Sequence, residues 1–446
     1  MEIVIQILQL LLSLSILIIL HEGGHFLFAR LFNTRVEKFY LFFNPWFSLF
    51  NFKKGQTEYG LGWLPLGGYV KISGMIDESM DKEAMKQPPK DYEFRAKPAW
   101  QRLLIMLGGV LVNLLLGFLI YSAVLFTWGE KYLPAENLTD GVWVTDSVAM
   151  EMGLQNGDKI IRVDGEPVER FNEIMGDMLS ASHVTIERDG KQKQIDLPKD
   201  FAGQLVENKA GLILYPRIPF FVQQVPDSSV NKQSGLKEKD KVVGIEGEPI
   251  QYYDQVIHKL DQYKGDTICI TVERDSELRE LNVYITENGQ MEVQAAILPP
   301  DDLDRMGIYT YKTKKYSLLR SIPAGFSTAT SRLLSYIDQF RLILSPETGA
   351  YKGLGGFGTI MGLFPASWDW QSFWELTAFL SLILAFMNIL PIPALDGGHV
   401  MFLIYEIIAG RKPNEKFMEY AQMIGMILLL TLLLYANGMD VIRGCT

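Results

Sequence analysis

The sequence predicts a multi-pass α-helical membrane protein with four transmembrane helices, a membrane-associated β-hairpin or sheet, and two tandem α+β domains. Three observations lead to this fold class. Of the 446 residues, 48% are hydrophobic, which is too apolar for a simple soluble protein, and the chain is too long for one ordinary domain. Four stretches are long and uncharged enough to span a bilayer. Between the second and third stretch, one sequence phrase occurs twice.

The first apolar stretch covers residues 3–28 and could be mistaken for a secretory signal. It lacks a basic leading region and a small-residue cleavage site, so we expect it to be retained as a transmembrane helix. The other three stretches cover residues 103–128, 376–395, and 423–435 with flanks.

The end of the first stretch carries the motif His21-Glu22-Gly-Gly-His25. On a helix, two histidines four positions apart lie on one face and can share a zinc ion. Glu22 is then placed to act as general base toward a metal-activated water. The alternative is an accidental pair of histidines satisfied by backbone or water. Ionisable groups in a membrane segment are costly unless they are used, so we favour a zinc hydrolase with its active site within the membrane.

The charge pattern predicts how the spans are oriented. The loop between the first two spans and the loop before the last one are rich in lysine and arginine, which places both in the cytosol. The middle segment is acidic and would lie on the opposite side. The first and third spans then run in the same direction, which brings Asp396 to the depth of the two histidines. A carboxylate is an acceptable third zinc ligand. The alternative is a turn residue, because Asp-Gly-Gly often reverses the chain.

Between the first two spans, residues 39–50 are too apolar for a free loop, and residues 60–72 alternate apolar residues with glycines. We interpret them as sheet and re-entrant backbone that dips into the membrane. Residues 77–97 are charged and predict a solvated linker.

The repeated phrase covers residues 147–168 and 229–250, which predicts two related small domains, each with a further short helix near residues 171–180 and 253–263. Residues 314–344 have apolar side chains at helical spacing, as in helices at a membrane surface or capping the core, or equally in an ordinary packed helix pair. The glycine-rich residues 353–358 do not match a phosphate loop, and packing or flexibility is the better interpretation. Cys269 and Cys445 predict neither a disulfide framework nor a metal cluster.

Four features of the chain, taken in order, resemble the site-2 proteases, which are intramembrane zinc metalloproteases. They are the HEGGH motif, the segment Gly67-Gly-Tyr-Val-Lys71, the repeat pair, and the segment from Asn388 to Leu395-Asp396-Gly. The layout, with tandem PDZ domains between spans two and three, is similar to the regulator-of-sigma-E branch of that family. The likeness covers nearly the whole chain. The sequence departs from the family pattern at Gly23, at Val110 and near Gly356. These departures concern local packing and leave the metal ligands unaffected.

The resemblance implies roles for individual residues. His21, His25 and Asp396 would hold Zn²⁺, and Glu22 would activate the water. Asn388 would hold the extended substrate backbone, although its side chain could equally join helices as a polar contact. The edge formed by Gly67, Gly68, Tyr69 and Val70 would pair with the unwound substrate by strand addition.

The resemblance also implies partners and location. The substrates would be single-pass membrane proteins in the lipid bilayer, such as pre-trimmed anti-sigma factors or remnant signal peptides, and we expect no nucleic-acid partner. The protein would lie in the bacterial inner membrane. Its PDZ-like domains would be periplasmic, where they would contact substrate tails or exclude large substrates, and its active site would lie near the cytosolic side.

These inferences divide the chain into eight parts. They are the first span with HExxH (1–32), a cytosolic or re-entrant β region (33–101), the second span (102–128), PDZ-like domains (129–218 and 219–310), surface helices with the glycine-rich loop (311–372), the third span (373–398), and a cytosolic loop with the fourth span (399–446).

Two other function classes remain at this stage. A scaffold with a vestigial metal site would have no use for the general base Glu22. A transporter would be expected to have more spans and an inverted repeat of them.

Overall fold

The structure is a computed structural model that describes residues 2–65, 67–75, 88–208, 212–296, 298 and 300–445. The chain divides into two compact units. Unit 1 comprises Met1–Gly129, Lys315–Ile337 and Leu354–Thr446, and unit 2 comprises Glu130–Lys314 and Asp338–Gly353. Much of the predicted linker, namely residues 76–87, lies outside the described residues.

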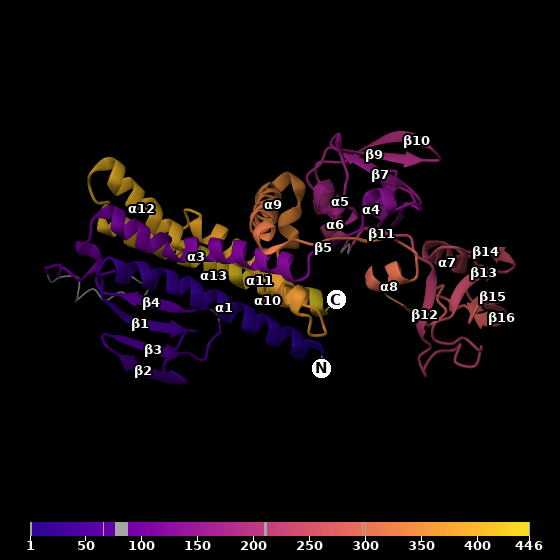
Figure 1. The fold of residues 1–446 in the computed structure, drawn as a ribbon, viewed down its shortest axis with the longest axis horizontal. Helices are drawn as coiled ribbons and strands as arrows, with labels where there is room; N and C mark the ends of the chain where they lie inside the picture. The colour runs from indigo at the N-terminus through magenta and orange to yellow at the C-terminus, as the bar shows by residue number, and fades with distance from the viewer. Residues whose placement is uncertain are drawn as a thin grey trace. The chain divides into compact units, whose positions relative to one another are not determined.

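Four helices of unit 1 are long and apolar enough to cross a membrane, in agreement with the four predicted spans. They are α1 (Glu2–Leu31), α3 (Ala99–Thr127), α11 (Trp370–Ile389) and α13 (Glu415–Cys445) (Figure 1). Helix α3 packs against α1, α11 and a further helix, α12 (Asp396–Ala409). Large apolar side chains on α1, α3, α12 and α13 remain exposed, as expected for helices that face lipid.

The third membrane helix is shorter than the sequence suggested. Helix α11 ends at Ile389, and Leu390 is extended with φ −59° and ψ 143°. Pro391 follows, and a proline disfavours the helical conformation of the residue before it. The chain then turns and starts α12 at Asp396. The predicted 373–398 span and the predicted loop after it are therefore wrong at this boundary, because a second apolar helix begins inside the Asp-Gly-Gly segment.

A four-stranded sheet packs beside α1 in unit 1 (Figure 1). Its strand order is β2-β3-β1-β4, so β4 is an edge strand. Strand β1 pairs in parallel with β3 and antiparallel with β4, with Phe39 opposite Val70. The strands are β1 (Val36–Leu41), β2 (Phe50–Lys54), β3 (Thr57–Leu61) and β4 (Tyr69–Ile72), and a short 3₁₀ helix, η1 (Phe94–Ala96), follows.

Between strand β18 (Lys312–Lys314) and helix α11, the chain forms one long helix and several short helical segments. The predicted helix pair is a single helix, α9 (Leu318–Leu344), which contains Pro323. The glycine-rich segment leads from the 3₁₀ turns η4 (Pro346–Thr348) and η5 (Ala350–Gly353) into α10 (Phe357–Gly362). The Asp440 carboxylate of α13 accepts hydrogen bonds from the backbone N–H groups of Gly356 and Thr359, at 2.9 and 3.0 Å. These bonds tie α10 to the last helix, so this segment serves packing.

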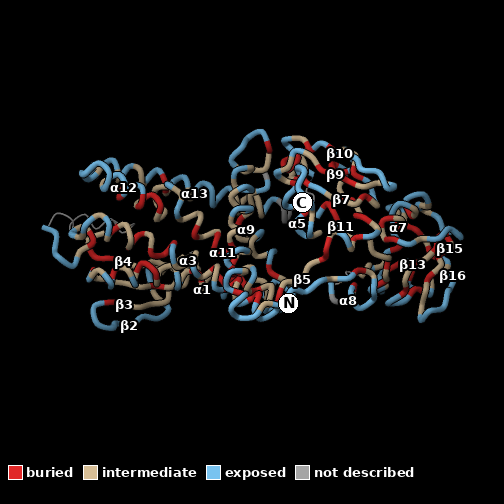
Figure 2. The backbone as a smooth tube through the Cα atoms, turned by 45° about the horizontal axis from the view of Figure 1, so that its top comes forward, coloured by how far each residue is buried: buried red, intermediate tan, exposed pale blue. Residues whose placement is uncertain are grey.

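Unit 2 contains two α/β lobes with separate cores (Figures 1 and 2). The first core includes Ile160, Met178 and Ile186, and the second includes Ile245, Val256 and Ile270. The first lobe comprises β5 (Glu130–Tyr132), η2 (Ala135–Asn137), β6 (Val142–Val144), α4 (Ser147–Glu151), β7 (Lys159–Val163), β8 (Glu166–Pro167), α5 (Phe171–Met178), β9 (His183–Arg188), β10 (Lys191–Asp196), α6 (Phe201–Glu207) and β11 (Leu214–Pro216).

The second lobe repeats this plan. It comprises β12 (Phe220–Gln224), β13 (Lys241–Ile245), β14 (Glu248–Pro249), α7 (Tyr253–Leu260), η3 (Asp261–Tyr263), β15 (Thr267–Arg274), β16 (Glu277–Tyr284) and β17 (Gln294–Ala295). Helix α8 (Pro300–Arg305) and strand β18 (Lys312–Lys314), which pairs with β5, complete the unit.

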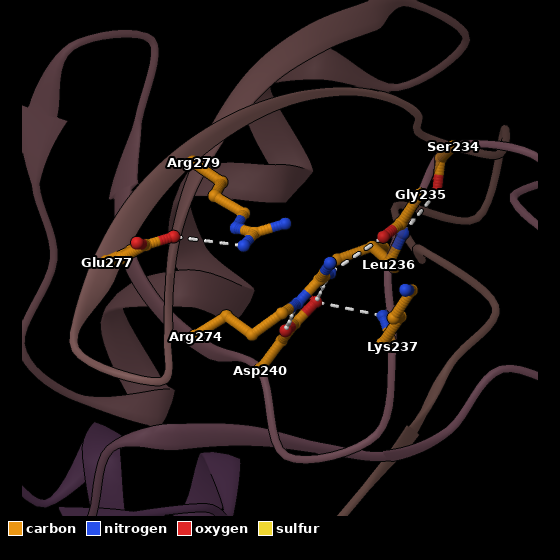
Figure 3. Close-up of polar contacts among 8 residues, drawn as sticks. All are labelled: Ser234, Gly235, Leu236, Lys237, Asp240, Arg274, Glu277 and Arg279. Atoms are coloured by element: carbon orange, nitrogen blue, oxygen red, sulfur yellow. Dashed lines mark hydrogen bonds and ion pairs between the residues drawn. The ribbon is translucent and has the colours of Figure 1, made fainter.

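The repeat extends to individual hydrogen bonds. In the second lobe, Arg274 binds both oxygens of buried Asp240 at 2.6 Å and donates to the Gly235 carbonyl at 2.7 Å (Figure 3).

The first lobe has the same network. Arg188 binds both oxygens of Asp158 at 2.6 and 2.7 Å and donates to the Gly153 carbonyl at 2.7 Å. The duplicated phrase therefore encodes a duplicated turn, in which a buried carboxylate binds the arginine at the end of β9 in one lobe and of β15 in the other.

Candidate metal centre

Three side chains from two distant segments converge in unit 1. The Nε2 atoms of His21 and His25 are 3.3 Å apart, and Oδ2 of Asp396 lies 3.2 and 3.3 Å from them, respectively. In the described part of the chain, this is the one group of three His, Cys, Asp or Glu side chains close enough to hold a metal ion. The topological argument for Asp396 therefore holds in space, since residues near opposite ends of the sequence meet at one point.

The spacing of these atoms suits zinc. Tetrahedral ligands at about 2.0–2.1 Å from Zn²⁺ lie about 3.3 Å from one another, close to all three separations. Oδ2 of Asp396 is buried and has no hydrogen-bond donor among the described residues. Buried acceptors without a partner are rare, and three that point at one another repel unless a cation lies between them. The donor set and its geometry therefore fit a zinc ion with one further position open for water.

Glycines allow the helices to come close enough to form this site. A Cβ atom at Gly109 of α3 would lie 2.5 Å from the His21 ring and 2.6 Å from Nε2 of His25. A Cβ at Gly24 would lie 2.2 Å from the backbone oxygen of Gly108. Gly24 thus serves helix contact. Gly23 has no atom within 4 Å of its Cβ position, so it takes no part in this contact.

Two glycines also shape the turn that carries the carboxylate. A Cβ at Gly397 would lie 2.1 Å from the Leu390 oxygen, and a Cβ at Gly398 would lie 2.7 Å from Cα of Pro393. Asp396 is the first residue of α12, so its carboxylate also lies at a helix N-terminus, where negative charge is favoured. The turn interpretation and the ligand interpretation of Asp396 are therefore compatible.

The edge strand β4 lies beside the proposed general base. A Cβ at Gly68 would meet the Ile18 side chain at 2.6 Å and would lie 3.5 Å from Cγ of Glu22. The Glu22 carboxylate is within hydrogen-bonding reach of the backbone N–H of Val70. The rings of Tyr69 and Tyr40 stack with centroids 5.3 Å apart, which fixes the start of β4 against β1.

The structure does not link Asn388 to this cluster. It lies half-buried in the last turn of α11, and its side chain forms no hydrogen bond within the described residues. His399, which follows the Asp-Gly-Gly segment, has its Nε2 atom 3.1 Å from the side-chain amide of Gln422 on α13.

Sequence reasoning missed Asn113 of α3, whose side-chain amide is 3.2 Å from Nδ1 of His21. A buried asparagine in the predicted second span was the available signal, but its partner could not be known without the helix packing.

Unit 2 contains a polar pocket. It has a volume of about 240 Å³, and its lining includes Asp140, Arg217 and Tyr252. Arg217 pairs with buried Asp254 at 2.8 Å and lies over the Tyr252 ring at 4.0 Å. Burial, together with a hydrogen bond to Asp140, raises the pKa of Tyr252 to about 12, so its hydroxyl keeps its proton at neutral pH. This pocket joins polar side chains within the unit and has no metal-ligand group among the described residues.

A HExxH helix that joins a distant aspartate among apolar spanning helices defines a membrane metallopeptidase. Residues 9–432 match peptidase family M50, and the chain belongs to this family of site-2 proteases. It is 27% identical to a protein of Neisseria meningitidis named "Putative zinc metalloprotease", over 98% of this chain and 99% of that protein.

Two further relatives also match over almost their full length. A Thermotoga maritima protein of the same name is 25% identical, over 98% of this chain and 99% of the relative. The regulator of sigma E protease of Haemophilus influenzae is 26% identical, over 97% of this chain and 98% of the relative. The predictions of a zinc metalloprotease and of a Zn²⁺ cofactor are confirmed by these relationships.

Proposed function

We propose that the chain is a zinc-dependent endopeptidase that cleaves transmembrane segments of single-pass membrane proteins within the bilayer. One observation carries this proposal. The HExxH histidines of α1 meet Asp396 in a set of helices that are long and apolar enough to cross a membrane. A hydrolytic centre in that position is suited to peptide bonds that water does not otherwise reach.

In this proposal His21, His25 and Asp396 hold the zinc. When bound, the ion would supply Lewis acidity toward the scissile carbonyl and the attacking water. Glu22 takes a proton from the attacking water and delivers it to the leaving amine.

The substrate would bind as an added strand. A transmembrane helix hides its peptide bonds in intrahelical hydrogen bonds, so it must be extended before attack. Strand β4 is at the sheet edge, and Val70 lies next to Glu22. An extended segment paired along Gly67, Gly68, Tyr69 and Val70 would therefore present its backbone to the catalytic groups. Asn388 would hold the other side of that backbone, and its side chain is free to do so among the described residues.

Charge and the relatives support a proposal for the location and the partners. Lysine and arginine in the loop before α3 favour a cytosolic position for the site side of the membrane, and the acidic unit 2 would lie in the periplasm of a bacterial inner membrane. The two lobes would be PDZ-like domains that contact substrate tails or exclude large external domains. The candidate substrates are trimmed anti-sigma factors, in keeping with the sigma E in the name of the Haemophilus relative, and remnant signal peptides.

A cleavage assay tests the proposal. Purified full-length protein in detergent is incubated with a single-pass reporter, with and without a zinc chelator, and the products are located by mass spectrometry. We expect a cut inside the transmembrane segment that is lost with chelator and restored by added zinc. No cleavage under any zinc condition, with the reporter bound, would favour a scaffold, and ion flux without reporter after reconstitution into sealed vesicles would favour a transporter.

A further inference from the structure

One face of helix α3 contacts both histidine rings. Ile105, Gly109 and Asn113 are spaced four residues apart, so they lie along one stripe of the helix. The middle residue leaves room for the two rings, since a Cβ at Gly109 would lie within 2.7 Å of both. The outer two residues each place a polar atom next to an Nδ1 atom.

His25 shows what such a contact does. Its Nδ1 atom is 2.9 Å from the backbone oxygen of Ile105. A carbonyl oxygen can only accept, so Nδ1 of His25 carries the proton and donates it. The Nε2 lone pair then faces Asp396, which is the tautomer a metal ligand requires.

As a metal ligand, His21 must also carry its proton on Nδ1, but this atom has a different partner from that of His25. Its Nδ1 atom is 3.2 Å from the carboxamide of Asn113, a fully buried side chain at 0% exposure. If the amide nitrogen donated, the proton of a neutral His21 would lie on Nε2 and occupy the space shared with Asp396. The carboxamide oxygen has no partner among the described residues, and a half-turn of the amide exchanges its oxygen and nitrogen.

We propose that Asn113 is a positioning residue whose side-chain oxygen accepts a hydrogen bond from Nδ1–H of His21, which holds the Nε2 lone pair toward the metal position. This inference rests on the proposed function, in which His21 is a zinc ligand. Helix α3 then orients both imidazole rings. The backbone carbonyl of Ile105 holds the ring of His25, and the side chain of Asn113 holds the ring of His21. Ser381 of α11 donates to the backbone oxygen of Asn113 at 2.7 Å and keeps this turn of α3 in place.

The test is the zinc affinity of full-length protein in detergent, measured by competition with a chromophoric chelator. Asn113→Leu keeps the branched heavy-atom skeleton of the side chain and removes the acceptor, and its zinc dissociation constant should rise by about 10- to 100-fold. Asn113→Asp keeps an acceptor and cannot donate when ionised, so it should bind zinc nearly as tightly as the parent.

The matched control is Thr377→Val. Thr377 is also fully buried on a spanning helix and bonds to Ser13 at 3.0 Å, so the change removes a buried hydrogen bond away from the imidazoles. It should leave zinc affinity unchanged. A His21→Ala background completes the design, since Asn113→Leu should add no further loss when its partner ring is absent.

Two results would overturn the proposal. Asn113→Leu could bind zinc as tightly as the parent, or Asn113→Asp could lose as much affinity as Asn113→Leu, as expected if the amide nitrogen were the donor. If His21→Ala itself keeps full zinc affinity, the ligand set of the proposed function is wrong. A loss in His21→Ala with none in Asn113→Leu refutes only the role of Asn113.

Discussion

Gly24 and Gly108 face each other across the contact between helices α1 and α3. A Cβ at Gly24 would lie 2.2 Å from the Gly108 oxygen, and a Cβ at Gly108 would lie 2.7 Å from the Gly24 oxygen. Both contacts are to backbone, which cannot move aside as a side chain can. His25 follows Gly24 in sequence, so the separation of the two helices sets the position of a proposed ligand.

Substitution Gly24→Ala should therefore disturb both packing and metal binding. We expect a loss of about 1–3 kcal/mol in unfolding free energy, typical of overpacking, together with a lower zinc content. Thermal unfolding and metal analysis of the purified protein measure these effects. Gly23→Ala is the matched control, because its Cβ meets nothing within 4 Å, and it should be neutral or up to about 1 kcal/mol stabilising. Equal effects of the two changes would refute the packing role.

Substitution Glu22→Gln should separate metal binding from catalysis. Glu22 is not among the three converging ligand atoms, so zinc content should stay at the parent level. Cleavage of the reporter should fall by at least about 100-fold, because the amide cannot accept the proton of the attacking water. Asp396→Ala is the comparison, and it should lose both zinc and cleavage. Reporter cleavage by Glu22→Gln at the parent rate would remove Glu22 as the general base.

Substitution Gly68→Ala should impair the substrate edge while leaving the metal in place. The added methyl would meet the Ile18 side chain at 2.6 Å and the Tyr40 backbone oxygen at 2.7 Å, which should displace β4 from α1. We expect slower cleavage and weaker reporter binding at unchanged zinc content. Gly176→Ala, in a helix of unit 2 with nothing within 4 Å, is the control. If Gly68→Ala lowers zinc content as much as cleavage, the change acts through the metal site.

The two lobes of unit 2 should depend equally on their buried carboxylates. Asp240→Ala leaves Arg274 partly buried without its partner, and loss of one member of a buried pair typically costs about 3–5 kcal/mol. Asp158→Ala should act likewise through Arg188. Hydrogen exchange of full-length protein should show faster exchange in the affected lobe alone.

Glu277→Ala is the control for this pair of variants. It breaks the solvent-exposed pair of Glu277 with Arg279, 3.0 Å apart, which is drawn beside the Asp240 network in Figure 3. Exposed ion pairs contribute little, so exchange should not change. Uniformly protected lobes in Asp240→Ala would contradict a structural role for that carboxylate.

Much of the membrane unit was predictable because its signals are local. A run of uncharged apolar residues specifies a spanning helix almost by itself, and α1 and α3 end within a few residues of their predicted limits. HExxH needs only one helical turn to bring its histidines together. Asp396 needed one further constraint, the shared direction of the first and third spans, and the structure places it beside both rings.

The sequence predictions failed at helix boundaries and side-chain contacts that depend on tertiary packing. The apolar run after α11 continues through prolines, so composition alone did not show that α11 stops at Ile389 and that α12 begins at Asp396. The 314–344 segment forms one helix although Pro323, its sixth residue, has no N–H to donate within the helix. Asn113 is inconspicuous in sequence, because its partner ring belongs to another helix.

The convergence of Asp396 with the HExxH histidines also bears on how the enzyme matures. His21 and His25 leave the ribosome first, whereas the aspartate that completes the cluster follows roughly 370 residues later. A nascent chain therefore holds two imidazoles and a glutamate before the third proposed metal ligand has been made. Proteolytic capacity would be withheld during membrane insertion, so that a half-made copy is harmless to neighbouring proteins.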